Sequence, residues 1–195
     1  MPSRALTLWT TTATARLDEI EQAHRAVGGG GRGRRIATLQ INHAYAMLLS
    51  SHFQGFCRDL HSEAIDHLCS RVAEPWAAPL LRERLTENRK LDAGNPNPGN
   101  LGADFGRLGM RLWPAVQAVD ARNRARQEKL ESLNRWRNAI AHQDFTRPEL
   151  DLGGGRRDLH LADVRAWRTA CGSLATALDR VVGEHIAALV GGAPW

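Results

Sequence analysis

The chain has 195 residues, of which 43% are hydrophobic and 24% charged, which excludes a disordered protein and suits one domain with a sizeable core. The net charge of +5 permits an acidic partner such as nucleic acid, although arginine supplies nearly all of the cations and such a skew is also typical of GC-rich coding. No apolar run is long enough for a signal peptide or a membrane span, so we expect a cytoplasmic protein.

A first helix is expected to begin at Thr12 or Thr14 and to end where four consecutive glycines start at Gly28, because glycine gives up much backbone entropy in a helix. The Gly/Arg stretch 28–35 is interpreted as a flexible connector, with an RGG-type RNA-binding tract as the alternative. The expected organisation is therefore an N-terminal helix and connector over 1–35 and a helical domain over 36–192, forming a single domain overall.

Apolar residues recur at helical spacing through the rest of the chain, and strand-like alternation is absent. This periodicity predicts an all-α fold, a bundle of four principal helices plus short connecting ones. After the first helix, the expected helices cover 36–72, 80–91, a short turn from Asn100, 115–142 with a boundary at Trp113-Pro114, and 161–190.

Metal, cofactor and thiol chemistry find little support in the sequence. The four histidines of the second helix, His43, His52, His61 and His67, are not spaced as an i, i+4 metal pair. The three cysteines have neither zinc nor redox spacing, and their odd number does not favour a disulfide framework. We expect buried free thiols, no metal and no cofactor.

The end of the helix expected over 115–142 carries the residues with the clearest chemistry, in the pattern Arg137-Asn138-x-x-x-His142. Asn138 and His142 are four residues apart and lie on one face, so the amide can hydrogen-bond the imidazole and fix its tautomer. Arg137 and His142 are separated by roughly 140° around the axis. One helix does not readily aim both at one phosphate unless His142 lies where the helix ends, whereas a two-fold dimer would bring two copies together.

This motif, preceded by a leucine-rich run, resembles the signature of the HEPN superfamily, small all-helical proteins that include metal-independent RNases of toxin–antitoxin and phage-defence systems. The run from His52 to Leu60 and the segment from Asn95 to Leu112 are similar to the RiboL-PSP-HEPN branch, so the resemblance spans about 36–190. One departure is Gln54, which stands where that branch has an acidic residue.

The resemblance implies a homodimeric, metal-independent endoribonuclease that leaves a 2′,3′-cyclic phosphate, with RNA as substrate and a possible antitoxin or defence partner protein. The expected catalytic residues are Arg137 for the phosphate, His142 for the proton and Asn138 for orientation. Arg135, Gln54 and Arg58 are expected to line the cleft or bind substrate. Trp136, beside Arg137, is the candidate anchor of the dimer interface, although a core position is the alternative.

Two other functions are left open by the sequence. The first is a non-catalytic helical module that binds RNA or protein, in which Arg137 pairs with an acidic residue and His142 merely ends a helix. The second is a nucleotide-binding subunit beside a nucleotidyltransferase. The tyrosine that some HEPN toxins offer for modification after the motif is missing here, since the segment continues as Gln143-Asp144-Phe145.

Overall fold

The computed structural model describes residues 1–28 and 36–195, and in these residues it is all-α, as the periodicity predicts. The principal helices are α2 (Thr14–Gly28), α3 (Ile36–Ser70), α8 (Asn123–His142) and α9 (Leu161–Val190). Shorter elements are α1 (Arg4–Leu8), a π-helical turn η1 (Trp9–Ala13), α4 (Ala77–Thr86), α5 (Lys90–Ala93), α6 (Pro98–Gly106), α7 (Leu112–Val119) and a 3-10 turn η2 (Pro148–Leu150). The helices expected over 36–72 and 161–190 are confirmed as α3 and α9.

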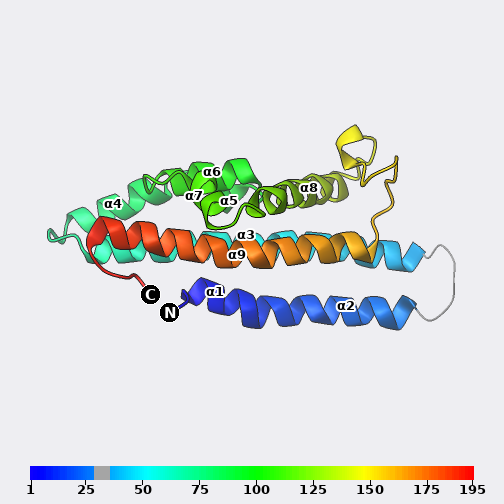
Figure 1. Cartoon of the computed structure of the whole chain (residues 1–195), viewed down its shortest axis with the longest axis horizontal. Helices are drawn as coiled ribbons and strands as arrows, with labels where there is room; N and C mark the ends of the chain where they lie inside the picture. Colours follow the sequence, from blue (N-terminus) through cyan, green and yellow to red (C-terminus); the bar gives the residue numbers. More distant parts are fainter. Residues whose placement is uncertain (29–35) are drawn as a thin grey trace.

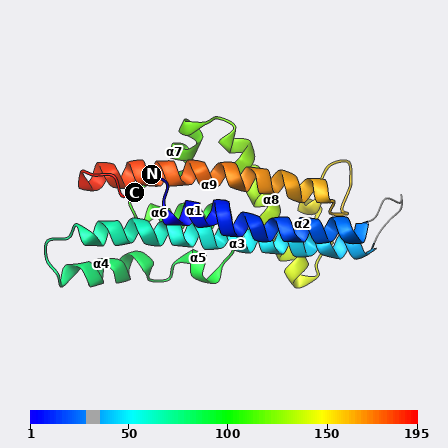
Figure 2. The ribbon, with the colours of Figure 1, turned by 90° about the horizontal axis from the view of Figure 1, so that it is seen from below.

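The bundle has three layers, with α3 and α9 side by side in the middle (Figure 1). On one side of this pair lie α1 and α2, and on the other lie α4 to α8 (Figures 1 and 2). The core is formed by inward-facing apolar residues of the long helices, among them Leu49 and Phe53 of α3, Leu133 of α8 and Leu178 of α9, all fully buried. Burial of such side chains is the main source of stability in a bundle.

The first helix begins earlier than the sequence predicts, because α1 starts at Arg4 rather than at Thr12 or Thr14. The hydroxyl of Ser3 accepts a hydrogen bond from the amide of Leu6, and the Glu63 carboxylate of α3 accepts from the amides of Arg4 and Ala5. These acceptors satisfy the free amides of the first turn. The acceptor from α3 is a tertiary contact, which a single-sequence pattern does not contain.

Two helices expected to be continuous are broken. The one expected over 80–91 is divided into α4 and α5 by Asn88, which has a left-handed φ of 54°. The one expected over 115–142 is divided into α7 and α8, because the backbone at Asp120 is extended and the Asn123 side chain donates to the carbonyl of Val116 at 2.7 Å. Polar side chains that bind nearby backbone compete in this way with helix continuation.

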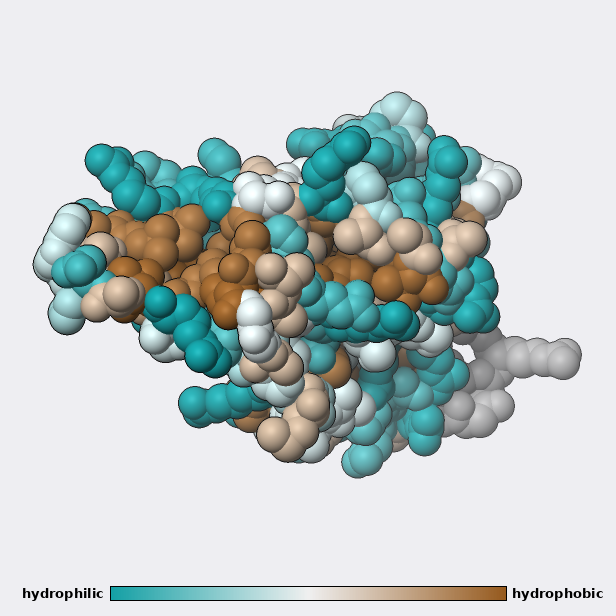
Figure 3. Space-filling model, turned by 60° about the vertical axis from the view of Figure 1, so that its left-hand side comes forward, coloured by the Kyte–Doolittle hydropathy of each residue, from teal (hydrophilic) through white to brown (hydrophobic). Residues whose placement is uncertain are grey.

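Apolar residues gather in a band on one face of the molecule, at the level of the α3 and α9 layer (Figure 3). Bands of this kind are typical of surfaces that contact another macromolecule. Within residues 1–28 and 36–195, no helix combines the length and the apolar character needed to cross a bilayer. The Gly/Arg stretch from residue 29 to 35 lies outside the described residues, so its interpretation as a connector or an RNA-binding tract stays a prediction.

Candidate functional site

The three residues of the motif lie in the last two turns of α8, which ends at His142. Gln143 adopts a left-handed conformation. Its backbone amide donates a hydrogen bond to the carbonyl of Ile140, and the amide of Asp144 donates one to the carbonyl of Ala139. These two hydrogen bonds form a Schellman motif, which stops the helix directly after His142. The imidazole is exposed, and it lies where the helix ends, which is one of the two arrangements in which Arg137 and His142 can act on one phosphate; the other is a two-fold dimer.

Asn138 does not contact His142 as the helical spacing predicts. Its Oδ1 accepts a hydrogen bond of 2.9 Å from Nδ2 of Asn95, in the loop between α5 and α6, and one of 3.3 Å from Nη1 of Arg137. The expected bond between Asn138 and His142 is absent from the described part of the chain. The reason is tertiary, because the loop brings a second amide to the same face of α8. Asn138 therefore orients Arg137 and not the imidazole.

Arg137 is half-buried and has a neutral partner. Within the described residues, no carboxylate forms an ion pair with it, whereas Arg135 two residues earlier pairs with Glu131 at 3.4 Å. A guanidinium that is held by an amide keeps its full charge and its outward donors for an anion. This arrangement suits the binding of a phosphate.

The loop that supplies Asn95 is itself fixed by an asparagine network, which we define as Asn95, Asn97, Asn100, Asn134 and Asn138. Asn97 donates to Oδ1 of Asn95 at 2.9 Å, and Asn100 donates to the Asn95 carbonyl at 2.8 Å. Asn134 donates to the carbonyl of Pro96 at 3.2 Å and accepts from Ser50 of α3 at 3.0 Å. Asn134 and Asn138 thus hold the loop at two points one helical turn apart.

Gly94, where this loop begins, leaves little room for a side chain. A Cβ at this position would lie 2.8 Å from Nδ2 of Asn100, a distance at which one of the two atoms has to move. The Cβ would also lie 3.1 Å from the carbonyl oxygen of Lys90, so a side chain at this position would disturb the hydrogen bond from Asn100 to the Asn95 carbonyl. The sequence interpretation missed Asn95 and Asn134, although two asparagines four residues apart on α8 and a loop rich in asparagine were visible signals.

The three residues expected to line the cleft have different surroundings. Gln54 donates to the carbonyl of Leu91 in α5 at 2.8 Å and so fixes the helix that precedes the Asn95 loop. Arg58 is exposed and lies 3.5 Å from Asp59, and its carbonyl accepts a bond from Arg89. Arg135 is exposed on the outer face of α8. In the described part of the chain, hydrogen bonds and ion pairs join none of the three to Arg137 or His142.

Trp136 is not a free interface anchor, because it is only 1% exposed. Its ring packs against Trp167 of α9, with centroids 6.5 Å apart, and against Phe145 and His43. The prediction of an anchor at the dimer interface is therefore wrong, and the core alternative holds. Trp136 lies on the same inward face of α8 as Leu133 and Ile140, which explains why its side chain is buried in the core.

The cysteines do not offer a competing nucleophile. All three are free and buried, as expected. Burial raises the pKa of the Cys57 thiol well above its ordinary value, and it does the same for Cys171. A thiol that resists deprotonation is a poor nucleophile.

Comparisons of the chain with protein-family models, with curated proteins and with solved structures gave no match in any of the three.

Proposed function

We propose that the protein is a metal-independent endoribonuclease of a toxin–antitoxin or phage-defence system, in which Arg137, Asn138 and His142 form the site. The proposal rests on the HEPN-like motif and on one structural observation. Arg137 is half-buried, oriented by the amide of Asn138 and without an ion pair in the described residues. A charged side chain that is partly withdrawn from water for structural reasons is commonly paired with an opposite charge, so the neutral partner of Arg137 favours a role in binding an anionic ligand.

The chemistry of the three groups matches RNA cleavage without a metal. His142 accepts the proton of a ribose 2′-hydroxyl, whose oxygen attacks the adjacent phosphorus. The bond from phosphorus to the 5′-oxygen breaks, the leaving oxygen takes a proton from water, and His142 releases its proton to the solvent. Arg137 stabilises the charge on the non-bridging oxygens through its bidentate fork. The products are a 2′,3′-cyclic phosphate and a 5′-hydroxyl, and DNA is not a substrate because it lacks the 2′-hydroxyl.

The Arg137 that acts together with each His142 comes from a second copy of the chain. Arg137 and His142 point in directions that differ by roughly 140° around the axis of α8. An isologous contact between two copies of the C-terminal end of α8 would bring Arg137 of one copy to His142 of the other. The exposed position of His142 and the small exposed side chain of Ala141 leave this end of α8 open for such a contact.

A non-catalytic helical module that binds RNA or protein is the alternative, and one observation favours it. The Oδ1 atom of Asn138 is already used twice inside the fold, by Asn95 and by Arg137. In that reading the motif fixes the loop between α5 and α6 against α8 and takes no part in chemistry.

Two substitutions separate these functions. His142→Ala should abolish cleavage of single-stranded RNA and cost no more than about 1 kcal/mol of stability, because the side chain is exposed. Arg137→Lys should lose most activity, since an ammonium does not reproduce the bidentate fork. Arg124→Lys, at an exposed position of the same helix, is the matched control and should cleave as the wild type does.

Two outcomes would contradict the assignment as a nuclease. If His142→Ala and Arg137→Lys cleave RNA like the wild type, or if the purified wild type cleaves no RNA once any bound partner is removed, the binding module replaces the nuclease. Thermal melts of each variant show whether a lost activity reflects lost folding.

A further inference from the structure

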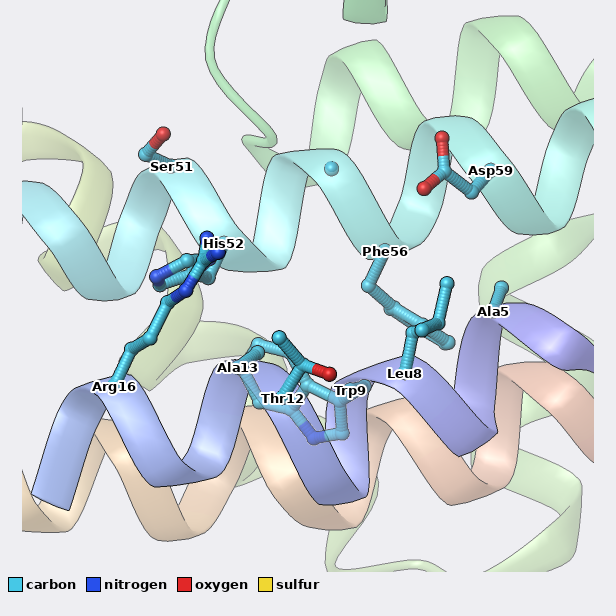
Figure 4. A pocket seen from close by; sticks show the side chains of 11 residues that line it. Ala5, Leu8, Trp9, Thr12, Ala13, Arg16, Ser51, His52, Phe56 and Asp59 are labelled. Atoms are coloured by element: carbon cyan, nitrogen blue, oxygen red, sulfur yellow. The ribbon is translucent and has the colours of Figure 1, made fainter.

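A pocket of about 220 Å³ lies on the opposite side of α3 from the motif, where α1, η1 and the start of α2 pack alongside α3 (Figure 4). Its floor is apolar and includes Trp9 and Phe56, which are 5% and 4% exposed. Its rim carries polar groups from both walls, Thr12 and Arg16 on one side and His52 and Asp59 on the other. The volume equals that of about seven water molecules, so it suits a small organic molecule and not a drug-sized one.

The π-helical turn η1 forms one wall of this pocket. The hydroxyl of Thr14 donates to the carbonyl of Trp9, five residues earlier, at 2.9 Å. The wider turn keeps the Trp9 ring against Phe53 and Phe56, at centroid distances of 5.5 and 5.9 Å. Single π turns are uncommon and are frequently found at functional sites.

Thr12 differs from the other threonines of this segment. The hydroxyls of four of them donate to backbone carbonyls, namely Thr7, Thr10, Thr11 and Thr14. Within the described residues the Thr12 hydroxyl has no such bond, and it lies at the pocket (Figure 4). It is available to a ligand.

Gly55 leaves the α3 wall of the pocket open. It lies in the interior of a 35-residue helix, where glycine is a poor helix former. A Cβ at this position would meet no atom within 4 Å, so packing does not require the glycine. Its effect is to keep free the space between Ser51 and Asp59 that a larger side chain would occupy.

The polar groups at one end of the pocket are suited to an anion. Arg16 extends from α2 across the pocket to His52 of α3 (Figure 4), and it forms no ion pair within the described residues. Nε2 of His52 is buried and has no hydrogen-bond partner. Burial, and secondly the charge of Arg16, lower the pKa of His52, so a neutral imidazole can donate one hydrogen bond beside the guanidinium. An anion placed between the two groups would satisfy both.

We propose that this pocket binds a small organic anion, with a carboxylate or phosphate at Arg16 and His52 and an apolar body over Phe56 and Trp9. Asp59 lies two helical turns along α3 from His52. It sets the orientation of the ligand in the pocket, because its charge repels the anionic end of the ligand. The proposal stands independently of the nuclease, since none of these residues belongs to the motif.

Calorimetric titration of the full chain tests it with 3-phenylpropionate and phenyl phosphate as anionic probes and 3-phenylpropionamide as the uncharged match. We expect the anions to bind with dissociation constants of about 1 mM or below, as fragment-sized ligands do. Arg16→Met should weaken both by about tenfold or more, the effect of losing a charge-assisted hydrogen bond. Arg84→Met, at an exposed arginine of α4, should bind as the wild type does.

Gly55→Leu gives a second, independent variant, because it fills the pocket without removing a polar group. It should abolish binding while the melting temperature stays the same or rises. Gly172→Leu is its matched control, since Gly172 also lies within a long helix and a Cβ there would likewise meet no atom within 4 Å, but it is outside the pocket. It should leave binding unchanged.

Preference for phenyl phosphate or for 3-phenylpropionate would each support the proposal and would identify the anionic group. Three results would overturn it. The first is no binding of either anion up to about 10 mM, well above the expected affinity. The second is equal binding of the uncharged amide, and the third is unchanged binding by both Arg16→Met and Gly55→Leu.

Discussion

The side-chain amide of Asn95 donates a hydrogen bond of 2.9 Å to Oδ1 of Asn138, the atom that also accepts from Arg137. A loop residue more than 40 positions away in the sequence therefore controls the orientation of the motif arginine. Asn95 is 9% exposed and is held in turn by Asn97. The position of Arg137 thus depends on the whole asparagine network and not on α8 alone.

Asn95→Ala should lower RNA cleavage by about tenfold or more, because a misplaced catalytic group loses much of its effect. The free energy of unfolding should fall by about 1–2 kcal/mol, the cost of leaving a buried partner unsatisfied. Asn42→Ala is the control, since Asn42 is also buried and donates to a backbone carbonyl, that of Leu159. It should lose similar stability and keep its activity. Equal activity of both variants would show that the Asn95 bond serves packing only.

Mixing two inactive variants tests the composite site. Arg137→Ala and His142→Ala should each be inactive alone, but a dimer with one subunit of each kind holds one intact pair of Arg137 and His142. Random exchange of subunits should restore about one quarter of the wild-type sites. Native mass spectrometry measures the mixed dimer, and the cleavage rate of the mixture measures the recovery. Mixed dimers without any recovered activity would contradict a site shared between subunits.

Glu21 of α2 should make the stability of the protein dependent on pH. Arg165 of α9 hydrogen-bonds this carboxylate and lowers its pKa, while burial opposes the shift. A pKa that is lower in the folded state stabilises the protein above the unfolded value of about 4.3, and this stabilisation is lost as the pH falls through the folded value. Glu21→Gln should therefore lower the melting temperature at neutral pH, and the difference from the wild type should shrink in acid.

Glu19→Gln is the control for this measurement, because Glu19 is exposed on the same helix. Its melting temperature should follow the wild type throughout the pH range. A gap between wild type and Glu21→Gln that does not change between neutral and acidic pH would show that the ion pair with Arg165 does not couple α2 to α9.

Gln143→Gly should stabilise the protein by up to about 1 kcal/mol, since glycine adopts the left-handed conformation of a helix end without strain. Gln143 has a φ of 54°, and its side chain donates to the carbonyl of Ile140 at 2.7 Å, so the lost bond offsets part of the gain. Chemical denaturation measures the change. A destabilisation larger than about 1 kcal/mol would mean that the side-chain bond outweighs the backbone strain.

Much of the fold follows from the sequence, because long apolar stripes specify α3 and α9 almost to the residue. The errors fall where a contact between a side chain and the backbone, and not the apolar spacing, decides where a helix begins or ends. Glu63 of α3 caps the start of α1, and the side chain of Asn123 binds the carbonyl of Val116 between α7 and α8. The first contact joins residues 58 positions apart in the sequence, whereas the second is local, and neither follows from the spacing of apolar residues.

The candidate site was predictable only in part. The helical spacing of Arg137, Asn138 and His142 and the end of α8 could be read from the motif and the polar residues after it. The partner of Asn138 could not, because Asn95 reaches it through the loop between α5 and α6. The same spacing gave no means to decide between core and interface for Trp136, which the packing of α9 settles.

Cleavage of single-stranded RNA in the presence of EDTA, followed by analysis of the product ends, tests the central claim most directly. The proposal predicts cleavage by the wild type, products with a 2′,3′-cyclic phosphate and a 5′-hydroxyl, intact DNA of the same sequence, and no cleavage by His142→Ala. Cleavage that requires an added divalent metal, products with a 5′-phosphate, or equal cleavage by His142→Ala would contradict it.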